Sequence, residues 1–391
     1  MPPIDVSALH ERAKAGDVAA EDALGIIYDL GRDVPQDYIE AAKWFRLAAE
    51  NNYADAQMRL GKLYLEGNGV SQDYKEAFKW LHQSAIQNVP LAQSYLAFLY
   101  IQGKGVPQDY AEAFKWTQKA AGQNLRSAQR HLGLMYDLGR GVPKDSVQAA
   151  FWWQKAAEQG DAKSQFLLGV AYYNGHGVPK DETQSLSWCR KSADQGFAPA
   201  QDNLGSAYYY GNGVSQDALE AVKWYRKAAE QGYARAQYDL GSAYYLGKAV
   251  PQNLGKAVPQ NLDEAIKWLR KAAEQGDAAA QNDMGDAYHR GLGVEKNNTE
   301  AAKWFYKAAE QGDAKGQSNL GVSYRAGLGV PKDYSQSYMW LSLAAAQNDA
   351  KAISTIAVLE KSMTPDQIAE AKRRAAEWKP PPEGKDNARQ P

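Results

Sequence analysis

Apolar residues recur along this chain with the period of an α-helix. Leu60, Leu63 and Tyr64 fall on one face of a 3.6-residue period, and Trp80 and Leu81 belong to a second run of the same kind. No stretch alternates apolar and polar residues in the way that a half-buried β-strand does. The pattern therefore predicts pairs of short amphipathic helices and an all-α fold class.

Turn and capping residues mark the predicted ends of these helices. Gly67 ends the first helix, because glycine adopts the left-handed conformation at little cost. Asp73 and Glu76 predict a capping box at the start of the second helix, and Asn88, which tolerates a positive φ, ends that helix. The same spacing recurs at Asp37/Glu40, Asp73/Glu76, Asp109/Glu112, Asp145/Gln148, Asp181/Gln184, Asp217/Glu220, Asn261/Glu264, Asn297/Glu300 and Asp333/Gln336.

Nine regularly spaced tryptophans show that the helix pair is a repeat. They are Trp44, Trp80, Trp116, Trp152, Trp188, Trp224, Trp268, Trp304 and Trp340. The spacing is 36 residues except between Trp224 and Trp268, where it is 44 because LGKAVPQN occurs at 246–253 and again at 254–261. We interpret the second copy as a neutral in-frame duplication; the alternative is a selected loop that alters a partner site. We expect nine stacked units, since each unit buries its apolar face only against its neighbours.

Both ends of the repeat array predict capping helices. Leu9 and Ala13 match Phe45 and Ala49 in the second helix of the first repeat. The terminal units of a helical stack must cover its open ends. We therefore expect an N-terminal capping helix at 1–19, nine repeats at 20–348 with the duplication 246–261 in repeat seven, C-terminal capping helices at 349–379 and a disordered tail at 380–391.

The repeating unit has a specific motif. It reads A-Q-x-x-L-G-x-x-Y-x-x-G-x-G-V-x-x-D-x-x-x-A-x-x-W-x-x-x-A-A-x-x-G over residues 20–348. This motif resembles that of the Sel-one-like repeat (SLR) family, relatives of the tetratricopeptide repeat. The resemblance implies a right-handed α-solenoid, or superhelix, that works as a protein-interaction scaffold, in a family common in bacteria. The chain departs from the motif at Ala97, which replaces the first glycine of repeat three, and at Ala249 and Ala257, which replace a turn glycine of repeat seven.

Residues that could carry catalysis or bind a metal are few and scattered. The histidines form no pair at ligand spacing: His10, His82, His131, His176 and His289. The glycine-rich loops lack the Gly-Lys-Ser/Thr of a phosphate-binding loop. Cys189 stands where other repeats carry Phe, Leu, Trp or Tyr, so we expect a small buried hydrophobe and not a nucleophile. We therefore expect no catalytic residue, no metal site and no cofactor.

Charge and hydropathy exclude further classes. Lys and Arg number 45 and Asp and Glu number 46, for a net charge of −1, so the chain lacks the surplus of cations that binding nucleic-acid phosphates requires. No apolar run approaches the roughly 20 residues needed to span a bilayer. The first residues, MPPIDVSALHERAKAGD, lack the apolar core of a secretory signal. We therefore expect no nucleic-acid partner, no membrane insertion and a cytoplasmic location.

The candidate binding site is the surface of the first helix that varies between repeats. In related helical solenoids, the positions opposite the packed face of this helix line the concave groove. Aromatic residues gather at these positions in the middle repeats, and solvent-facing aromatic clusters are typical of binding surfaces. The predicted groove residues are Phe166, Tyr173, Tyr209, Tyr210, Tyr238, Tyr245 and His289. The alternative is that these rings only pack against each other along the stack.

Two function classes follow from these observations. The first is a non-enzymatic scaffold that holds a protein or peptide segment in the concave groove by shape and aromatic contact. The second, a hydrolase of β-lactam-like substrates, comes from the resemblance, because cysteine-rich SLR proteins are associated with β-lactam binding or hydrolysis. Those members look disulfide-linked and exported, whereas this chain has one cysteine and no export signal. The sequence therefore favours the scaffold.

Overall fold

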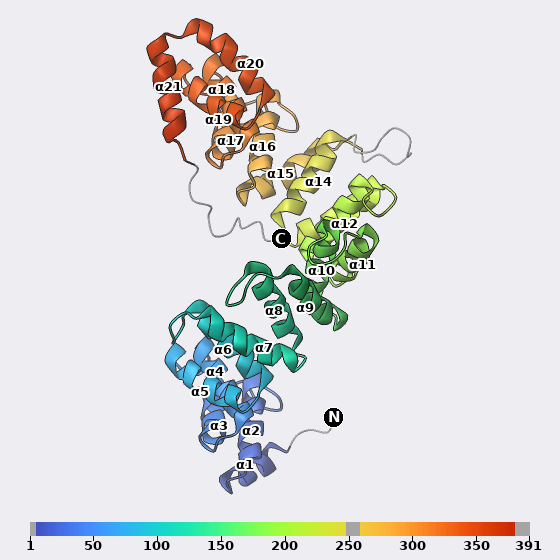
Figure 1. Cartoon of the computed structure of the whole chain (residues 1–391), viewed down its shortest axis with the longest axis vertical. Coiled ribbons are helices and arrows are strands. Elements are labelled where there is room, and N and C mark those ends of the chain that lie inside the picture. Colours follow the sequence, from blue (N-terminus) through green and yellow to red (C-terminus); the bar gives the residue numbers. More distant parts are fainter. Residues whose placement is uncertain (1–4, 248–258, 380–391) are drawn as a thin grey trace. The chain divides into compact units, whose positions relative to one another are not determined.

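The computed structural model describes residues 5–247 and 259–379. Most of the predicted duplication and the whole predicted tail 380–391 lie outside the described residues. Within the described residues, the regular structure consists of 21 α-helices and one short 3₁₀-helix (Figure 1). The predicted all-α solenoid of paired helices is thus confirmed.

The repeats share one plan of two helices of 13 residues each. The first helices are α2 (Val18–Leu30), α4 (Ala54–Glu66), α6 (Pro90–Gln102), α8 (Arg126–Leu138), α10 (Ala162–Asn174), α12 (Ala198–Tyr210), α14 (Ala234–Leu246), α16 (Ala278–Arg290) and α18 (Ala314–Ala326). The second helices are α3 (Tyr38–Glu50), α5 (Tyr74–Ile86), α7 (Tyr110–Gly122), α9 (Ser146–Glu158), α11 (Glu182–Asp194), α13 (Ala218–Glu230), α15 (Leu262–Glu274), α17 (Asn298–Glu310) and α19 (Tyr334–Ala346).

Further helices flank the repeats. Before them lies α1 (Val6–Lys14), and after them lie α20 (Ala350–Leu359), a 3₁₀ turn and α21 (Pro365–Glu377). The chain divides into two compact units, residues 1–181 with α1 to α10 and residues 182–391 with α11 to α21. Within each unit, consecutive helices pack against each other up to α20, whereas α21 packs against α19.

At the start of α5, only one of the two hydrogen bonds of the predicted capping box forms. The Asp73 carboxylate accepts hydrogen bonds from the backbone N–H groups of Lys75 and Glu76 at 2.8 and 3.1 Å, as an N-cap should. The backbone N–H of Asp73, however, donates to the carbonyl oxygen of Tyr64 at 3.0 Å. Because that donor is already satisfied, the Glu76 carboxylate accepts instead from Trp80 Nε1 at 3.1 Å.

The bond to the preceding tyrosine recurs at every repeat. The backbone N–H donors and carbonyl acceptors are Asp37 and Tyr28, Asp73 and Tyr64, Asp109 and Tyr100, Asp145 and Tyr136, Asp181 and Tyr172, Asp217 and Tyr208, Asn261 and Tyr244, Asn297 and Tyr288, and Asp333 and Tyr324. The second half of the predicted box is therefore wrong for the repeats, since this bond ties each interhelical loop back to the first helix. A complete box forms at Thr364 and Gln367, at the start of α21.

Glycine is required where backbones approach each other closely. Gly69, in the loop after α4, has a φ of +68°, and an added Cβ would lie 2.0 Å from the carbonyl oxygen of Tyr38 in the preceding repeat. Only glycine avoids both the strained φ and this clash. The helix ends predicted at Gly67 and Asn88 are confirmed, with φ values of +77° and +69°.

A second glycine lets the two helices of a repeat pack closely. An added Cβ at Gly133 of α8 would lie 2.5 Å from Trp153 Cδ1, and one at Gly205 of α12 would lie 2.7 Å from Tyr225 Cδ1. Repeat three carries Ala97 at this position of α6, and the residue after its tryptophan is the small Thr117. Both are buried, so the loss of the glycine coincides with a smaller partner.

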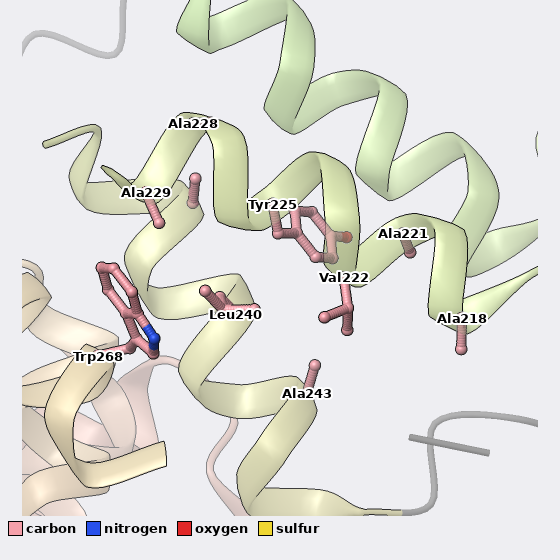
Figure 2. Close-up of a cluster of buried hydrophobic side chains, with 10 residues drawn as sticks. Ala218, Ala221, Val222, Tyr225, Ala228, Ala229, Leu240, Ala243 and Trp268 are labelled. Carbon is pink, nitrogen blue, oxygen red and sulfur yellow. The ribbon is translucent and has the colours of Figure 1, made fainter. Parts of the chain in front are cut away.

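The hydrophobic core runs between neighbouring helices. Figure 2 shows one cluster, in which Tyr225 of α13, Leu240 of α14 and Trp268 of α15 are buried together among alanines. The small alanines allow the helices to approach, and the large rings fill the space between them. Other clusters of the described residues likewise join adjacent repeats, or a terminal helix and the repeats beside it, as expected of a stacked array.

Buried glutamines connect each repeat to the one before it. Gln57 Nε2 donates to the carbonyl oxygen of Ala49 in the preceding repeat at 3.2 Å, and Gln57 Oε1 accepts from Gln87 Nε2 of its own repeat at 2.8 Å. We call the repeated Gln–Gln bond the glutamine ladder. It also joins Gln123 to Gln93, Gln159 to Gln129, Gln231 to Gln201, Gln275 to Gln237, Gln311 to Gln281 and Gln347 to Gln317.

We predict that Gln129→Met lowers the free energy of unfolding by about 1–3 kcal/mol, because it removes the ladder acceptor of Gln159 and the amide donor to the buried carbonyl of Ala121. Urea unfolding measures this loss. The control Gln154→Met changes an exposed glutamine of α9 and should cost less than about 0.5 kcal/mol. Equal costs for the two variants would contradict a stabilising role for the ladder.

Candidate partner-binding site

The seven predicted groove residues fall into two groups. Phe166 and Tyr173 lie on α10 in the first unit. The other five lie on three first helices of the second unit: Tyr209 and Tyr210 on α12, Tyr238 and Tyr245 on α14, and His289 on α16. The second unit therefore holds most of the candidate site.

Exposure separates these side chains further. Tyr210 is 67% exposed and Tyr173 is 44% exposed, whereas Tyr209, Tyr238, Tyr245 and His289 are half-buried. Phe166 is only 8% exposed. The expectation of a solvent-facing ring is therefore wrong for Phe166, whose side chain belongs to the packed interior.

Tyr209 and Tyr210 form an aromatic pair at the end of α12. Their ring centroids lie 4.8 Å apart with the planes at 79°, an edge-to-face arrangement that aromatic pairs favour. Tyr209 also packs against the core cluster around Leu240, and its carbonyl oxygen accepts from Gln216 Nε2 at 2.7 Å. One ring of the pair is thus anchored, and the other extends into solvent.

Tyr245 and His289 are held by hydrogen bonds within the protein. The Tyr245 hydroxyl donates to Asp286 Oδ2 at 3.0 Å, which links α14 to α16. His289 Nδ1 lies 3.0 Å from Asn298 Oδ1. Tyr238 and Tyr245 also pack on a buried cluster that includes Leu269. The alternative that these rings pack along the stack therefore holds in part, since they contribute to the core and to the surface.

Acidic side chains lie on the same three helices. Asp202 of α12 is 1% exposed, no N–H or hydroxyl group of the described residues donates to its carboxylate, and its hydrogen bond is with the carboxyl group of Asp239. Arg235 Nε lies 3.4 Å from Asp202 Oδ2 and 3.9 Å from Asp239 Oδ2 on α14. One guanidinium group therefore serves two carboxylates.

Burial raises the pKa of these carboxyl groups. It raises the pKa of Asp202 well above its usual range, and the charge of Asp239 raises it further while Arg235 opposes the shift. Burial also raises the pKa of Asp239, against the effect of Arg235. On α16, burial raises the pKa of Asp283 to about 6, although Asn282 and Lys315 favour its ionised form. Desolvation thus exceeds the stabilisation that nearby donors and cations supply.

We define the acidic first-helix face by five carboxylates of the second unit. They are Asp202, Asp239, Asp277, Asp283 and Asp286. Asp286 occupies a position that the sequence marks as opposite the packed face; Asp202 occupies another such position but is buried, like Phe166 at the equivalent position of α10. These residues are not aromatic, and the net charge of −1 for the whole chain does not reveal their local excess of negative charge.

The described residues show no arrangement suited to catalysis by a metal or a thiol. No group of three or more His, Cys, Asp or Glu side chains among them could hold a metal ion. Cys189 is buried, which raises the pKa of its thiol to about 11 and keeps it protonated at neutral pH. The prediction of a small buried hydrophobe is confirmed. Among the helices described, none is both long and apolar enough to cross a membrane.

Comparison with known families decides the classification. The Sel1 repeat pattern matches nine consecutive segments: 18–53, 54–89, 90–125, 126–161, 162–197, 198–233, 234–277, 278–313 and 314–349. The chain belongs to the Sel1 repeat family. Each matched segment begins with a first helix and ends after a second helix, and the longer seventh segment contains the additional eight residues.

Two solved Sel1-type structures resemble the chain over most of its length. A protective antigen of uropathogenic Escherichia coli with an SLR fold is 35% identical, with 94% of this chain and 85% of that chain covered and a TM-score of 0.59. A Sel1 repeat protein from Oxalobacter formigenes is 32% identical, with 90% and 89% covered and a TM-score of 0.50. Both come from bacteria, the origin that the sequence suggests. Comparison with proteins of curated function gives no significant match.

Sel1 repeat proteins are generally protein-interaction scaffolds. In this Sel1 repeat array the repeated positions form the core and the ladder, whereas the outer positions of α12, α14 and α16 carry tyrosines and aspartates. The candidate site therefore lies on the part of the repeat that the motif leaves free.

We predict that Asp283→Asn reduces the pH dependence of stability. The folded pKa of Asp283, about 6, exceeds the unfolded value of about 3.9, so its contribution is complete below the unfolded value and is lost as the pH rises through 6. Between pH 5 and 7.5 the wild type should lose about 1 kcal/mol more unfolding free energy than the variant. Urea titrations at both pH values measure this difference, and parallel losses would contradict the assignment.

Proposed function

We propose that this chain is a non-enzymatic scaffold that binds a protein or peptide segment on the first-helix side of its second unit. The observation that carries the proposal is Tyr210, a large aromatic side chain 67% exposed at the end of α12. Hydration of such a ring is unfavourable, and contact with a partner is the simplest reason to retain it.

The surroundings of Tyr210 support an anchoring role. Its edge-to-face contact with the half-buried Tyr209 restricts the ring before any partner arrives. A pre-organised aromatic group loses little conformational entropy on binding, and tyrosine is enriched at the energetic centres of interfaces. Tyr238 and Tyr245 on the next first helix extend the aromatic surface while remaining partly packed.

The family relationship supports the same function class. Sel1 repeat proteins generally bind other proteins, and the groove expected from the resemblance would be lined by first helices. Tyr173 on α10 provides a second exposed ring in the first unit. We propose it as a separate contact and assign the principal site to the second unit.

We predict that Tyr210→Ala weakens partner binding at least thirtyfold, because truncating an aromatic hot spot costs about 2 kcal/mol or more. The partner is first captured from a lysate with the full chain and purified, and calorimetry then measures its affinity. Since Tyr210 is exposed, helicity should stay unchanged and unfolding free energy should fall by no more than about 1 kcal/mol.

Tyr306→Ala is the matched control, because Tyr306 is 42% exposed on the second helix α17, outside the proposed site. The control should bind the partner within about twofold of the wild type. A folded Tyr210→Ala protein with wild-type affinity would move the interface elsewhere.

A further inference from the structure

The acidic first-helix face carries more negative charge than its own cations balance. Five aspartates on or beside α12, α14 and α16 face three cations, Arg235, Arg290 and Lys315 of α18. Arg290 Nη1 bonds to Asp286 Oδ2 at 3.1 Å, so Arg290 is already engaged. Arg235 is left near both Asp202 and Asp239, and its own side chain is 64% exposed.

Asp202 is the most deeply buried of these carboxylates. It is 1% exposed, neither oxygen accepts a hydrogen bond within the described residues, and the nearest guanidinium nitrogen is 3.4 Å away. A buried carboxylate without hydrogen bonds is costly. Burial, with the charge of Asp239 beside it, raises the pKa of Asp202 well above its usual range, so Asp202 donates a hydrogen bond to Asp239, and Asp239 carries the charge of the pair.

Asp283 of α16 is a second carboxylate whose pKa is raised mainly by burial. Asn282 Nδ2 donates to it at 3.2 Å, but no Lys or Arg nitrogen within the described residues reaches ion-pair distance. Lys315 lies close enough to favour its ionised form, whereas Asp286 and Asp313 oppose it. Asp277, in contrast, caps α16 by accepting from the N–H of Ala280 at 2.7 Å, a role that accounts for its carboxylate.

The tyrosines of the proposed site lie among these carboxylates. The charge of Asp239 acts on Tyr209, and the charges of Asp283 and Asp239 act on Tyr238. Tyrosine faces attract Lys and Arg side chains, and carboxylates bind the same groups by charge-assisted hydrogen bonds. The mixture of the two suits a cationic side chain better than an apolar or an acidic one.

Repetition makes the face suitable for an extended chain. The three first helices belong to consecutive repeats, and helices packed about 10 Å apart would place the outer pair roughly 20 Å apart. An extended polypeptide covers that length with about six residues. Nucleic acid is disfavoured by repulsion between its phosphates and the aspartates.

We infer that the acidic first-helix face binds a short, extended, Lys- or Arg-rich segment of a partner protein, with Asp239 and Asp283 pairing with its cationic side chains and Tyr209 and Tyr210 contacting them. This inference rests on the proposed function, because it specifies the chemistry of the segment that the scaffold holds.

The test uses the full chain and a fluorescein-labelled peptide of five Gly-Lys pairs, with fluorescence anisotropy as the measurement. The same peptide with Glu in place of Lys is the charge control. We expect the Lys peptide to bind and the Glu peptide to show no binding. The double variant Asp239→Asn/Asp283→Asn keeps the side-chain shape and should bind the Lys peptide at least tenfold more weakly.

Asp263→Asn is the matched control variant, because Asp263 is an exposed aspartate of the second helix α15 in the same unit. It should bind within twofold of the wild type. Circular dichroism and a urea titration confirm that all variants are folded. Wild-type affinity in a folded double variant, or equal loss in the control, would overturn the inference.

The pH provides a second readout of the same contact. Binding to the wild type should tighten between pH 5 and pH 7.5 as Asp239 and Asp283 ionise, and the double variant should lose most of this tightening. The charged groups that act on Asp239 are Arg235, Asp202 and Asp277, and those that act on Asp283 are Lys315, Asp286 and Asp313.

The result of this peptide test can be distinguished from the result of the test of the proposed function. In one outcome, Tyr210→Ala weakens binding of the purified partner but the Lys peptide does not bind. That outcome overturns the inference of a cationic segment and supports the scaffold proposal. Absence of both effects overturns both proposals.

Discussion

Buried amide groups must find hydrogen-bond partners, and in this chain that requirement fixes how consecutive repeats are positioned. Gln57 donates to the carbonyl of Ala49 in the repeat before it and accepts from Gln87 in its own repeat. A rotation or a shift between the two repeats would break these bonds and leave polar atoms buried without partners. The glycine at Gly61, where an added Cβ would lie 2.7 Å from Leu81 Cγ, permits the close approach that the bonds need. With the inner contacts fixed in this way, the outer positions of the first helices can vary.

Much of this architecture can be predicted from the sequence, because it depends on contacts that recur every 36 residues. Helix ends at Gly67 and Asn88 follow from local backbone preference and are observed. The glutamine residues are present in the sequence of every repeat from the second onward. Predicting that they pair requires knowing which helices are neighbours. The second hydrogen bond of the predicted capping box does not form at Asp73, because its backbone N–H bonds to Tyr64, a contact outside the local four-residue motif.

The candidate site was harder to predict than the fold. The aromatic positions can be found because they depart from the motif, but burial depends on the neighbouring helix, and this explains the error at Phe166. The acidic first-helix face cannot be recognised from the net charge, because a whole-chain sum averages over a local excess of aspartates. Their burial is unfavourable at neutral pH, where Asp283 must ionise in a partly desolvated position. A site that reduces stability without a structural purpose is a reasonable place to look for binding.

The central claim is that an invariant packed core presents a variable first-helix surface to a partner. Hydrogen–deuterium exchange of the full chain, with and without the purified partner, tests this claim most directly because it reports on each helix separately. The account predicts that the partner slows exchange in α12, α14 and α16, where Tyr210, Asp239 and Asp283 lie. The second helices α13, α15 and α17 should change much less. Protection confined to those second helices would contradict the account.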